Sequence, residues 1–420
     1  MLYSSVIKPL EQKDLAQSVL PLIRARGELY RKAIANAHGR EMHDAVDLLE
    51  EALQTGDPKE VFIVTQKAIT SAMYVIAKAD DSYGIIGDAC RRLLTLHPKV
   101  AAYAQVPAAP LVSWMIKFQF DGIVDYFTLD PVDYAPALGE LGMARYRKEL
   151  VARETKLGPR PNDDERWSSD HSHAWFVLGW NEKRLAVLDR DIDAIIRTHV
   201  GDRRVAAWFE DTAKAFAEID EFDLAMDWAQ QATDFGSGHQ SLHASQYLCE
   251  LLVVHRPAEL LRARLSNFHR WPSSGTAAAL HTAAGPDWTK YEQETMKLLT
   301  QRPNDSVQFA LYTLKDPARA WEIAHTLELA SDHTWEILAE AYEQIDPLAV
   351  LPVYTHLIEN ELAIADSKRY KAAARYLNRM RTLTAGTEEL NAVDSFIASL
   401  RHENRHRPRL QREFDRAGLP

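Results

Sequence analysis

Two histidines near the C-terminus have the spacing of a zinc-hydrolase motif. His402 and His406 flank Glu403 in the pattern H-E-x-x-H. In that pattern two histidines on one helix face bind zinc and the glutamate polarises a water molecule. Pro408 would interrupt the helix soon after the second histidine, and neighbouring arginines such as Arg407 would repel a divalent cation. We therefore predict no metal ligand or catalytic residue here, and a metal-dependent hydrolase is the least favoured hypothesis.

A second group of candidate ligands lies in the middle of the chain. It contains Asp170, His171 and His173, with the acidic residues 163–165 nearby. Carboxylate and imidazole groups at loop spacing could hold a metal, but a polar linker explains the same residues. The sequence contains no phosphate-binding loop, no dinucleotide-binding glycine motif and no nucleophile elbow. These observations favour a protein that is not an enzyme and has no cofactor.

Basic residues are concentrated at the C-terminal end. Residues 368–420 contain 12 Lys+Arg and 6 Asp+Glu, whereas the whole chain has a net charge of −11. Arginines interleaved with tyrosines could contact phosphates and stack on bases, although arginines on surface helices could equally pair with acidic groups of the same chain. The candidate nucleic-acid-binding residues are Arg375, Arg379, Arg401, Arg405, Arg407, Arg409 and Arg412.

An aromatic run provides a different candidate, a groove for a protein partner. Trp114 and Phe118 are four residues apart and so share one face of a predicted helix, and Tyr126 and Phe127 follow in a proline-containing segment. Aromatic side chains often anchor partners at interfaces. The alternative is that the four residues form a core where helices and a turn meet.

These candidates must be positioned by helices, because helical periodicity extends through nearly the whole chain. One helix is predicted over residues 15–37, and another begins at Pro58 after Asp57. From residue 205 onward, short helices alternate with short turns, and small alanines allow close packing. This pattern is typical of tetratricopeptide-type repeats. The predicted fold is an all-α solenoid of helical hairpins, in one or two lobes.

The sequence also suggests how the chain is divided. Gly158, Pro159 and the following polar residues favour a boundary near residues 157–172. We predict an N-terminal helical lobe at 1–157, a helical-hairpin repeat region at 174–365 and basic capping helices at 366–420. A solenoid needs a cap that covers its last apolar face. The predicted cap residues are Tyr370, Leu377, Met380, Leu383, Phe396 and Leu400.

Composition limits the compartment and the class of partner. Apolar residues make up 46% of the chain, and no stretch approaches the ~18 consecutive apolar residues of a membrane span. Lys8 and Pro9 argue against a signal peptide, and Cys90 and Cys249 form no motif, which favours reduced thiols in the cytoplasm. The acidic balance disfavours coating of nucleic acid by the whole surface. The expected partner is a protein or peptide, with nucleic acid as the alternative and no membrane.

Several stretches give the chain a family resemblance. It resembles the helical C-terminal region of bacterial SWIM zinc-finger proteins, but it lacks the zinc module C-x-C…C-x-H, so no zinc ligand carries over. The resemblance implies a helical-repeat scaffold that works with partner proteins and allows a place near nucleic acid. The similar stretches are residues 80–87, 93–97, 118–121, 134–142, 184–191, 370–377, 405–408 and 414–419.

Overall fold

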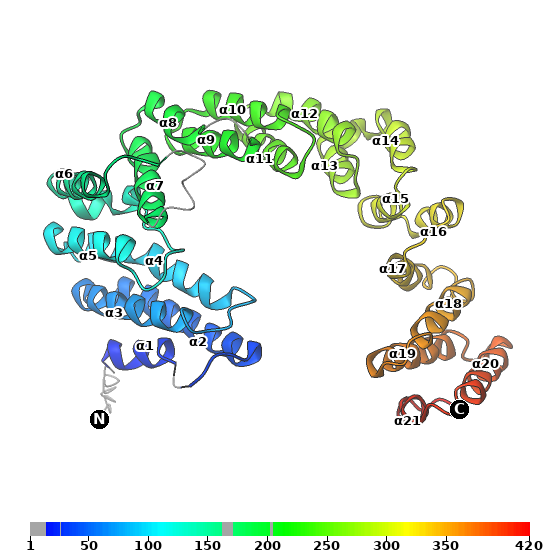
Figure 1. Ribbon diagram of the computed structural model, residues 1–420. Coiled ribbons are helices and arrows are strands. Elements are labelled where there is room, and N and C mark those ends of the chain that lie inside the picture. The colour runs from blue at the N-terminus through cyan, green and yellow to red at the C-terminus, as the bar shows by residue number, and fades with distance from the viewer. Residues whose placement is uncertain (1–13, 26, 162–170, 202–204) are drawn as a thin grey trace, which may run out of the picture. The chain divides into compact units, whose positions relative to one another are not determined.

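The computed structural model describes residues 14–25, 27–161, 171–201 and 205–420. Within these ranges the regular structure is helical throughout, with no strand (Figure 1). Helices pack mainly against their neighbours in the sequence, as in a solenoid. The predicted all-α class with stacked helices is confirmed. Contacts divide the chain into two compact units, Met1–Trp228 and Ala229–Pro420.

The first unit is built on α1 to α9 and the start of α10. The helices are α1 (Leu15–Ile23), α2 (Lys32–Thr55), α3 (Pro58–Ile76), α4 (Ile85–Tyr103), α5 (Ala108–Phe120), α6 (Pro131–Leu157), α7 (Ser172–Leu188), α8 (Ile192–His199), α9 (Ala206–Glu218) and α10 (Phe222–Asp234).

Local sequence signals explain where several of these helices start. The Asp57 side chain accepts a hydrogen bond from the Lys59 N–H, and Pro58 occupies the first turn, where its missing N–H costs nothing. Asp130 and Pro131 start α6 in the same way. The predicted start at Pro58 is therefore confirmed.

A closed ring of hydrogen bonds connects α5, α6 and α7 inside the first unit. Gln119 Nε2 donates to Tyr146 Oη (2.7 Å), Tyr146 Oη donates to Asn181 Oδ1 (2.6 Å), and Asn181 Nδ2 donates to Gln119 Oε1 (3.1 Å). All three side chains are buried, so each polar group is satisfied where water cannot replace it. The ring fixes α7 onto the α5–α6 pair.

The same packing extends across the segment 157–172, where the sequence predicts a boundary. Trp175 and Leu178 of α7 belong to the same apolar core as Tyr146 and Leu150 of α6. The contacts separate the two units inside α10. Prolines and polar residues after 157 indicate a turn, but they cannot show which helices pack together.

The second unit comprises the rest of α10 and the helices that follow. These are α11 (His239–His255), α12 (Pro257–Arg270), α13 (Ser274–Ala284), a 3-10 turn at Gly285–Lys290, α14 (Glu292–Leu299), α15 (Pro303–Gln308), a π-helical turn at Phe309–Thr313, α16 (Pro317–Thr326), α17 (Asp332–Tyr342), α18 (Leu351–Leu362), α19 (Ser367–Leu383), α20 (Glu389–Glu403) and α21 (Pro408–Arg416).

The last three helices complete the apolar core of the second unit. Tyr370, Leu377 and Met380 of α19 are buried in one cluster with Tyr354 and Ile358 of α18. Leu400 is buried there too, and Leu383 and Phe396 pack on its edge. The predicted packing of these residues is confirmed, and α21 adds a helix that the sequence reading did not predict. The region 366–420 therefore shares its core with the preceding helices.

Candidate functional site

The predicted aromatic groove is not formed as one exposed surface. Trp114 and Phe118 lie on α5 with ring centroids 5.3 Å apart, half-buried against the core of the first unit. Phe127 is buried, and only Tyr126 is exposed, at 57%. The predicted groove is absent because α5 packs the rings of Trp114 and Phe118 against the core, where their apolar area is removed from water. Trp114, Phe118 and Phe127 therefore pack within the first unit, and Tyr126 remains exposed.

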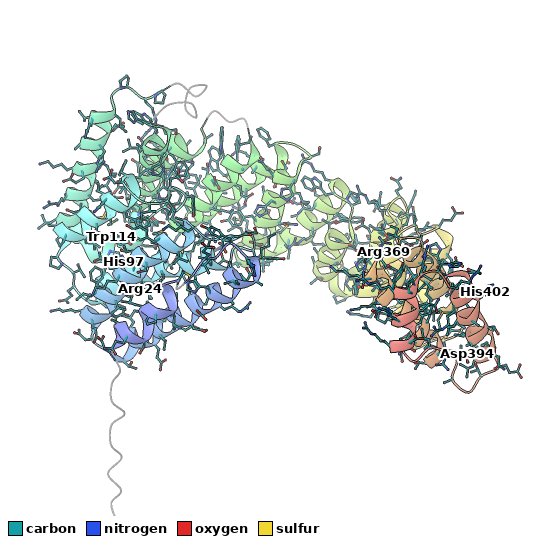
Figure 2. All side chains as sticks on the ribbon, turned by 60° about the horizontal axis from the view of Figure 1, so that its bottom comes forward. Arg24, His97, Trp114, Arg369, Asp394 and His402 are labelled. Atoms are coloured by element: carbon teal, nitrogen blue, oxygen red, sulfur yellow. The ribbon has the colours of Figure 1, made fainter. Side chains whose placement is uncertain are left out.

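Trp114 packs against a buried histidine. Its ring centroid is 4.3 Å from that of His97 on α4, and Figure 2 shows the two labelled side by side. His97 Nδ1 lies 2.9 Å from Tyr134 Oη, while Nε2 has no hydrogen-bond partner among the described residues. Burial lowers the pKa of His97 to about 3, so the imidazole is neutral near pH 7. Because His97 is inaccessible to solvent, we expect its lowered pKa to affect the stability of the fold and not the binding of a ligand.

A phosphate-binding surface needs arginines that are not paired with the protein's own carboxylates, and three of the seven C-terminal candidates are paired in this way. Arg375 Nη2 is 2.8 Å from Glu336 Oε1, and the Arg401 guanidinium is 3.0 Å from Asp415 Oδ1. Arg379 forms an ion pair with Glu343, and this pairing lowers the pKa of the glutamate. These three cations are largely neutralised by the protein's own carboxylates.

The other four candidate arginines behave differently. Arg407 Nη1 donates to the Leu362 carbonyl oxygen at 2.7 Å and so connects α21 to α18. Arg405, Arg409 and Arg412 are exposed and form no ion pair within the described ranges. The unneutralised basic surface is thus smaller than the sequence predicted.

The H-E-x-x-H string does not lie on one helix face. Helix α20 ends at Glu403, Asn404 caps it, and His406 lies in the turn before Pro408 begins α21. Helical spacing between His402 and His406 is therefore lost. No group of three or more His, Cys, Asp or Glu side chains in the described parts of the chain is arranged to hold a metal ion.

The second metal candidate is only partly described. His173 Nε2 lies 2.8 Å from the Gln119 carbonyl oxygen, which joins the start of α7 to α5. His171 precedes the first residue of α7 as its N-cap. Residues 163–165 and Asp170 lie outside the described residues.

The helix predicted over residues 15–37 is interrupted in the structure, and a hollow lies beside the interruption. Helix α1 ends at Ile23, and the connection to α2 turns away with extended backbone at Arg24. His38 Nε2 lies 3.0 Å from the Ile23 carbonyl oxygen, and the Asp80 N–H donates to the Leu29 carbonyl oxygen at 2.9 Å. The first contact ties the end of α1 to α2, and the second ties the connection to the residues that follow α3.

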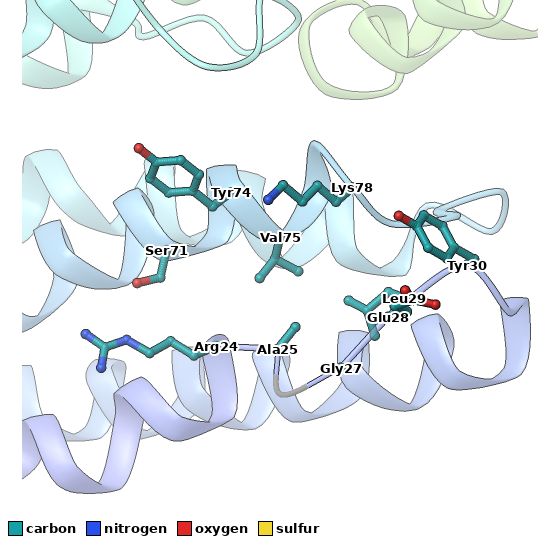
Figure 3. Close-up of a pocket in the computed structure, with 10 residues that line it drawn as sticks. All are labelled: Arg24, Ala25, Gly27, Glu28, Leu29, Tyr30, Ser71, Tyr74, Val75 and Lys78. Atoms are coloured by element: carbon teal, nitrogen blue, oxygen red, sulfur yellow. The ribbon is translucent and has the colours of Figure 1, made fainter.

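We call this feature the N-terminal hollow, with a cavity volume of about 380 Å³ (Figure 3). Leu29 and Val75 are nearly buried and supply apolar surface. The tyrosines Tyr30 and Tyr74 are 66% and 55% exposed. The residues that line it are Arg24, Ala25, Gly27, Glu28, Leu29, Tyr30, Ser71, Tyr74, Val75 and Lys78.

The N-terminal hollow carries both positive and negative charge. Arg24 and Lys78 are exposed, and within the described ranges neither forms an ion pair. Glu28 lines the hollow too, and Figure 3 shows it at the end away from Arg24. Two cations beside an apolar surface can bind a ligand that has an anionic group next to an apolar one.

A second hollow, between α2 and α4, is lined by three cations, and two of them, Arg91 and Arg92, pair with carboxylates. It has a volume of about 460 Å³, and its lining includes Arg91 and Arg92. The Arg92 guanidinium lies 2.6 Å from Asp47 and 2.9 Å from Glu50. Arg91 pairs with Asp88. The contrast makes the N-terminal hollow the better candidate for an external anionic group.

Comparison with known proteins assigns a family without a function. A family model described as "Family of unknown function (DUF6880)" matches residues 12–412. The chain belongs to this family. No curated protein matches the DUF6880 chain. The resemblance to SWIM proteins stays a prediction.

A structural comparison adds one finding. The DUF6880 chain is similar to a solved structure titled "Circular tandem repeat protein with novel repeat topology and enhanced subunit contact surfaces". The two share 11% identity over 96% of this chain and 93% of the other, with a TM-score of 0.15. Within the described residues, no helix has the length and apolar character to cross a bilayer.

Proposed function

We propose that the chain is a non-enzymatic helical-repeat scaffold that binds a protein or peptide partner. The observation that carries the proposal is the N-terminal hollow, where two exposed tyrosines and two cations without ion pairs surround an apolar floor. Exposed aromatic groups next to charged groups are typical of binding surfaces. Helical stacks present such surfaces on rigid elements. Work with partner proteins is also what the SWIM resemblance implies.

We further propose that the chain works in the cytoplasm. Cys90 and Cys249 are buried and form no disulfide. Burial raises the pKa of Cys90 to about 12, so this thiol stays protonated and inert. Two unpaired thiols suit a reducing compartment.

A second candidate function is association with nucleic acid. It is favoured by Arg405, Arg409 and Arg412, which are exposed near the C-terminal end and form no ion pair in the described ranges. Three arginines could contact phosphates, and such binding would weaken steeply as salt rises. The pairing of Arg375, Arg379 and Arg401 with carboxylates makes this the weaker proposal.

Affinity capture from the native cell distinguishes the two functions. The tagged chain is captured with and without nuclease treatment, and bound protein and nucleic acid are quantified. A scaffold should retain a partner protein at near-stoichiometric amount after nuclease. Retention of nucleic acid alone would support the second candidate, and retention of neither would contradict both proposals.

A further inference from the structure

We infer that the N-terminal hollow and the adjoining exposed face of α3 form a groove for an extended acidic peptide segment of a partner protein. This inference rests on the proposed function and adds the location of binding and the chemistry of the bound segment. It follows from the length of the exposed face, from its charge and from the apolar floor of the hollow.

The exposed face of α3 is longer than the hollow itself. Ile63, Lys67 and Tyr74 of α3 recur at intervals of four and seven residues, which places them on one side of the helix, and Lys78 lies in the turn just after its end. Ile63 is 52% exposed and Tyr74 is 55% exposed. With a rise of ~1.5 Å per residue, the face from Ile63 to Tyr74 extends about 16 Å, the length of about five extended residues. A peptide matches this length, whereas a compact small molecule would occupy only the hollow.

The charge of the groove selects an acidic occupant. Lys67 lies on the exposed face, and Arg24 and Lys78 lie at the hollow. In the described ranges none of the three forms an ion pair. Of the nearby acids, Glu60 precedes Ile63 by one turn of α3, and Glu28 lines the hollow at the end away from Arg24 (Figure 3). Complementary charge steers association and fixes the register of the bound segment.

The uncharged side chains of the hollow indicate that the bound segment also has apolar residues between its acidic ones. Leu29 and Val75 provide the floor, and the rings of Tyr30 and Tyr74 can cover an apolar side chain. The Ser71 hydroxyl lines the same hollow and can donate to a carbonyl or carboxylate oxygen. The predicted segment therefore combines Asp or Glu with Leu or an aromatic residue.

Selection from a random dodecapeptide library displayed on phage tests the inference. The wild-type chain should enrich peptides in which acidic and apolar residues are adjacent. A selected peptide, labelled with fluorescein, should bind in a polarisation assay and weaken as salt rises. The double variant Arg24→Glu, Lys78→Glu should bind it at least about 10-fold more weakly, since reversing two charges turns attraction into repulsion. Tyr74→Ala, at an exposed position, should weaken binding as well.

A matched charge reversal controls for net charge. Lys148→Glu, Lys156→Glu changes two exposed lysines of α6 and should leave peptide binding unchanged. Equal binding by both double variants, selected peptides without acidic residues, or no selected peptide would each overturn the inference. The scaffold proposal would survive those results if capture from the native cell still yields a partner protein.

Discussion

A chain that ends before Ser367 should melt at a temperature lower by about 10 °C or more. The deletion removes α19 to α21 and uncovers Tyr354, Leu357 and Ile358 of α18, which are nearly inaccessible in the full chain. Exposing a large apolar side chain costs about 1.5–3 kcal/mol. In a unit of this size, about 1 kcal/mol shifts the melting temperature by ~2–4 °C. Calorimetry of the full and shortened chains measures the shift.

The control separates the packing role of this region from its charge. Changing Arg405, Arg409 and Arg412 to Ser should shift the melting temperature by no more than about 2 °C, because these exposed side chains form no ion pair in the described ranges. Arg407 is kept, since its guanidinium bonds to the Leu362 carbonyl oxygen. An unchanged melting temperature after deletion would show that the region is not a cap.

Acidification from pH 7 to pH 5 should remove about 4 kcal/mol from the free energy of unfolding of the first unit. Burial lowers the pKa of His97 to about 3 and that of His199 to about 4, whereas both titrate near 6.5 in an unfolded chain. The unfolded chain therefore binds protons that the folded chain does not, and stability falls as pH drops below 6.5. Each histidine contributes on the order of 2 kcal/mol at pH 5. Urea unfolding at the two pH values measures the difference.

Single substitutions assign this pH dependence to its source. His97→Gln should reduce the loss between pH 7 and pH 5 by about half, whatever its effect at pH 7. Burial also raises the pKa of Asp133 and Asp211, and protonation of these carboxyls on acidification stabilises the folded chain, opposite in sign to the histidines. Comparing the variant with the wild type cancels this contribution and isolates that of His97. His402→Gln, on an exposed residue of the second unit, is the control and should leave the loss unchanged. A pH dependence equal in wild type and His97→Gln would contradict the assignment.

Signals within a few residues of each other predicted much of the fold. Asp57 and Pro58 start α3, and Asp316 and Pro317 start α16 by the same capping geometry. The apolar stripe of Tyr370, Leu377 and Met380 predicted their burial, because helical spacing fixes which side chains share a face. These features depend on local backbone preferences that a single sequence contains.

Features that depend on distant residues were not predictable in this way. Arg379 and Glu343 pair across 36 positions, and nothing in the local pattern of either residue reveals the other. The apolar spacing predicts one helix over residues 15–37, whereas α1 ends at Ile23 and α2 begins at Lys32. Gly27, a poor helix former next to Glu28, was the available signal. Missing that break meant missing the N-terminal hollow.

We propose that a partner protein binds at the exposed face of α3 in the first unit. The most direct measurement places a photo-cross-linking benzoylphenylalanine at Tyr74, or at Tyr103 as a matched control, in the native cell. Both tyrosines are exposed, at 55% and 69%, but only Tyr74 lines the N-terminal hollow. The account predicts that irradiation joins a protein to the Tyr74 position, identified by mass spectrometry, and yields much less at Tyr103. No protein adduct at Tyr74, or equal adducts at both positions, would contradict it.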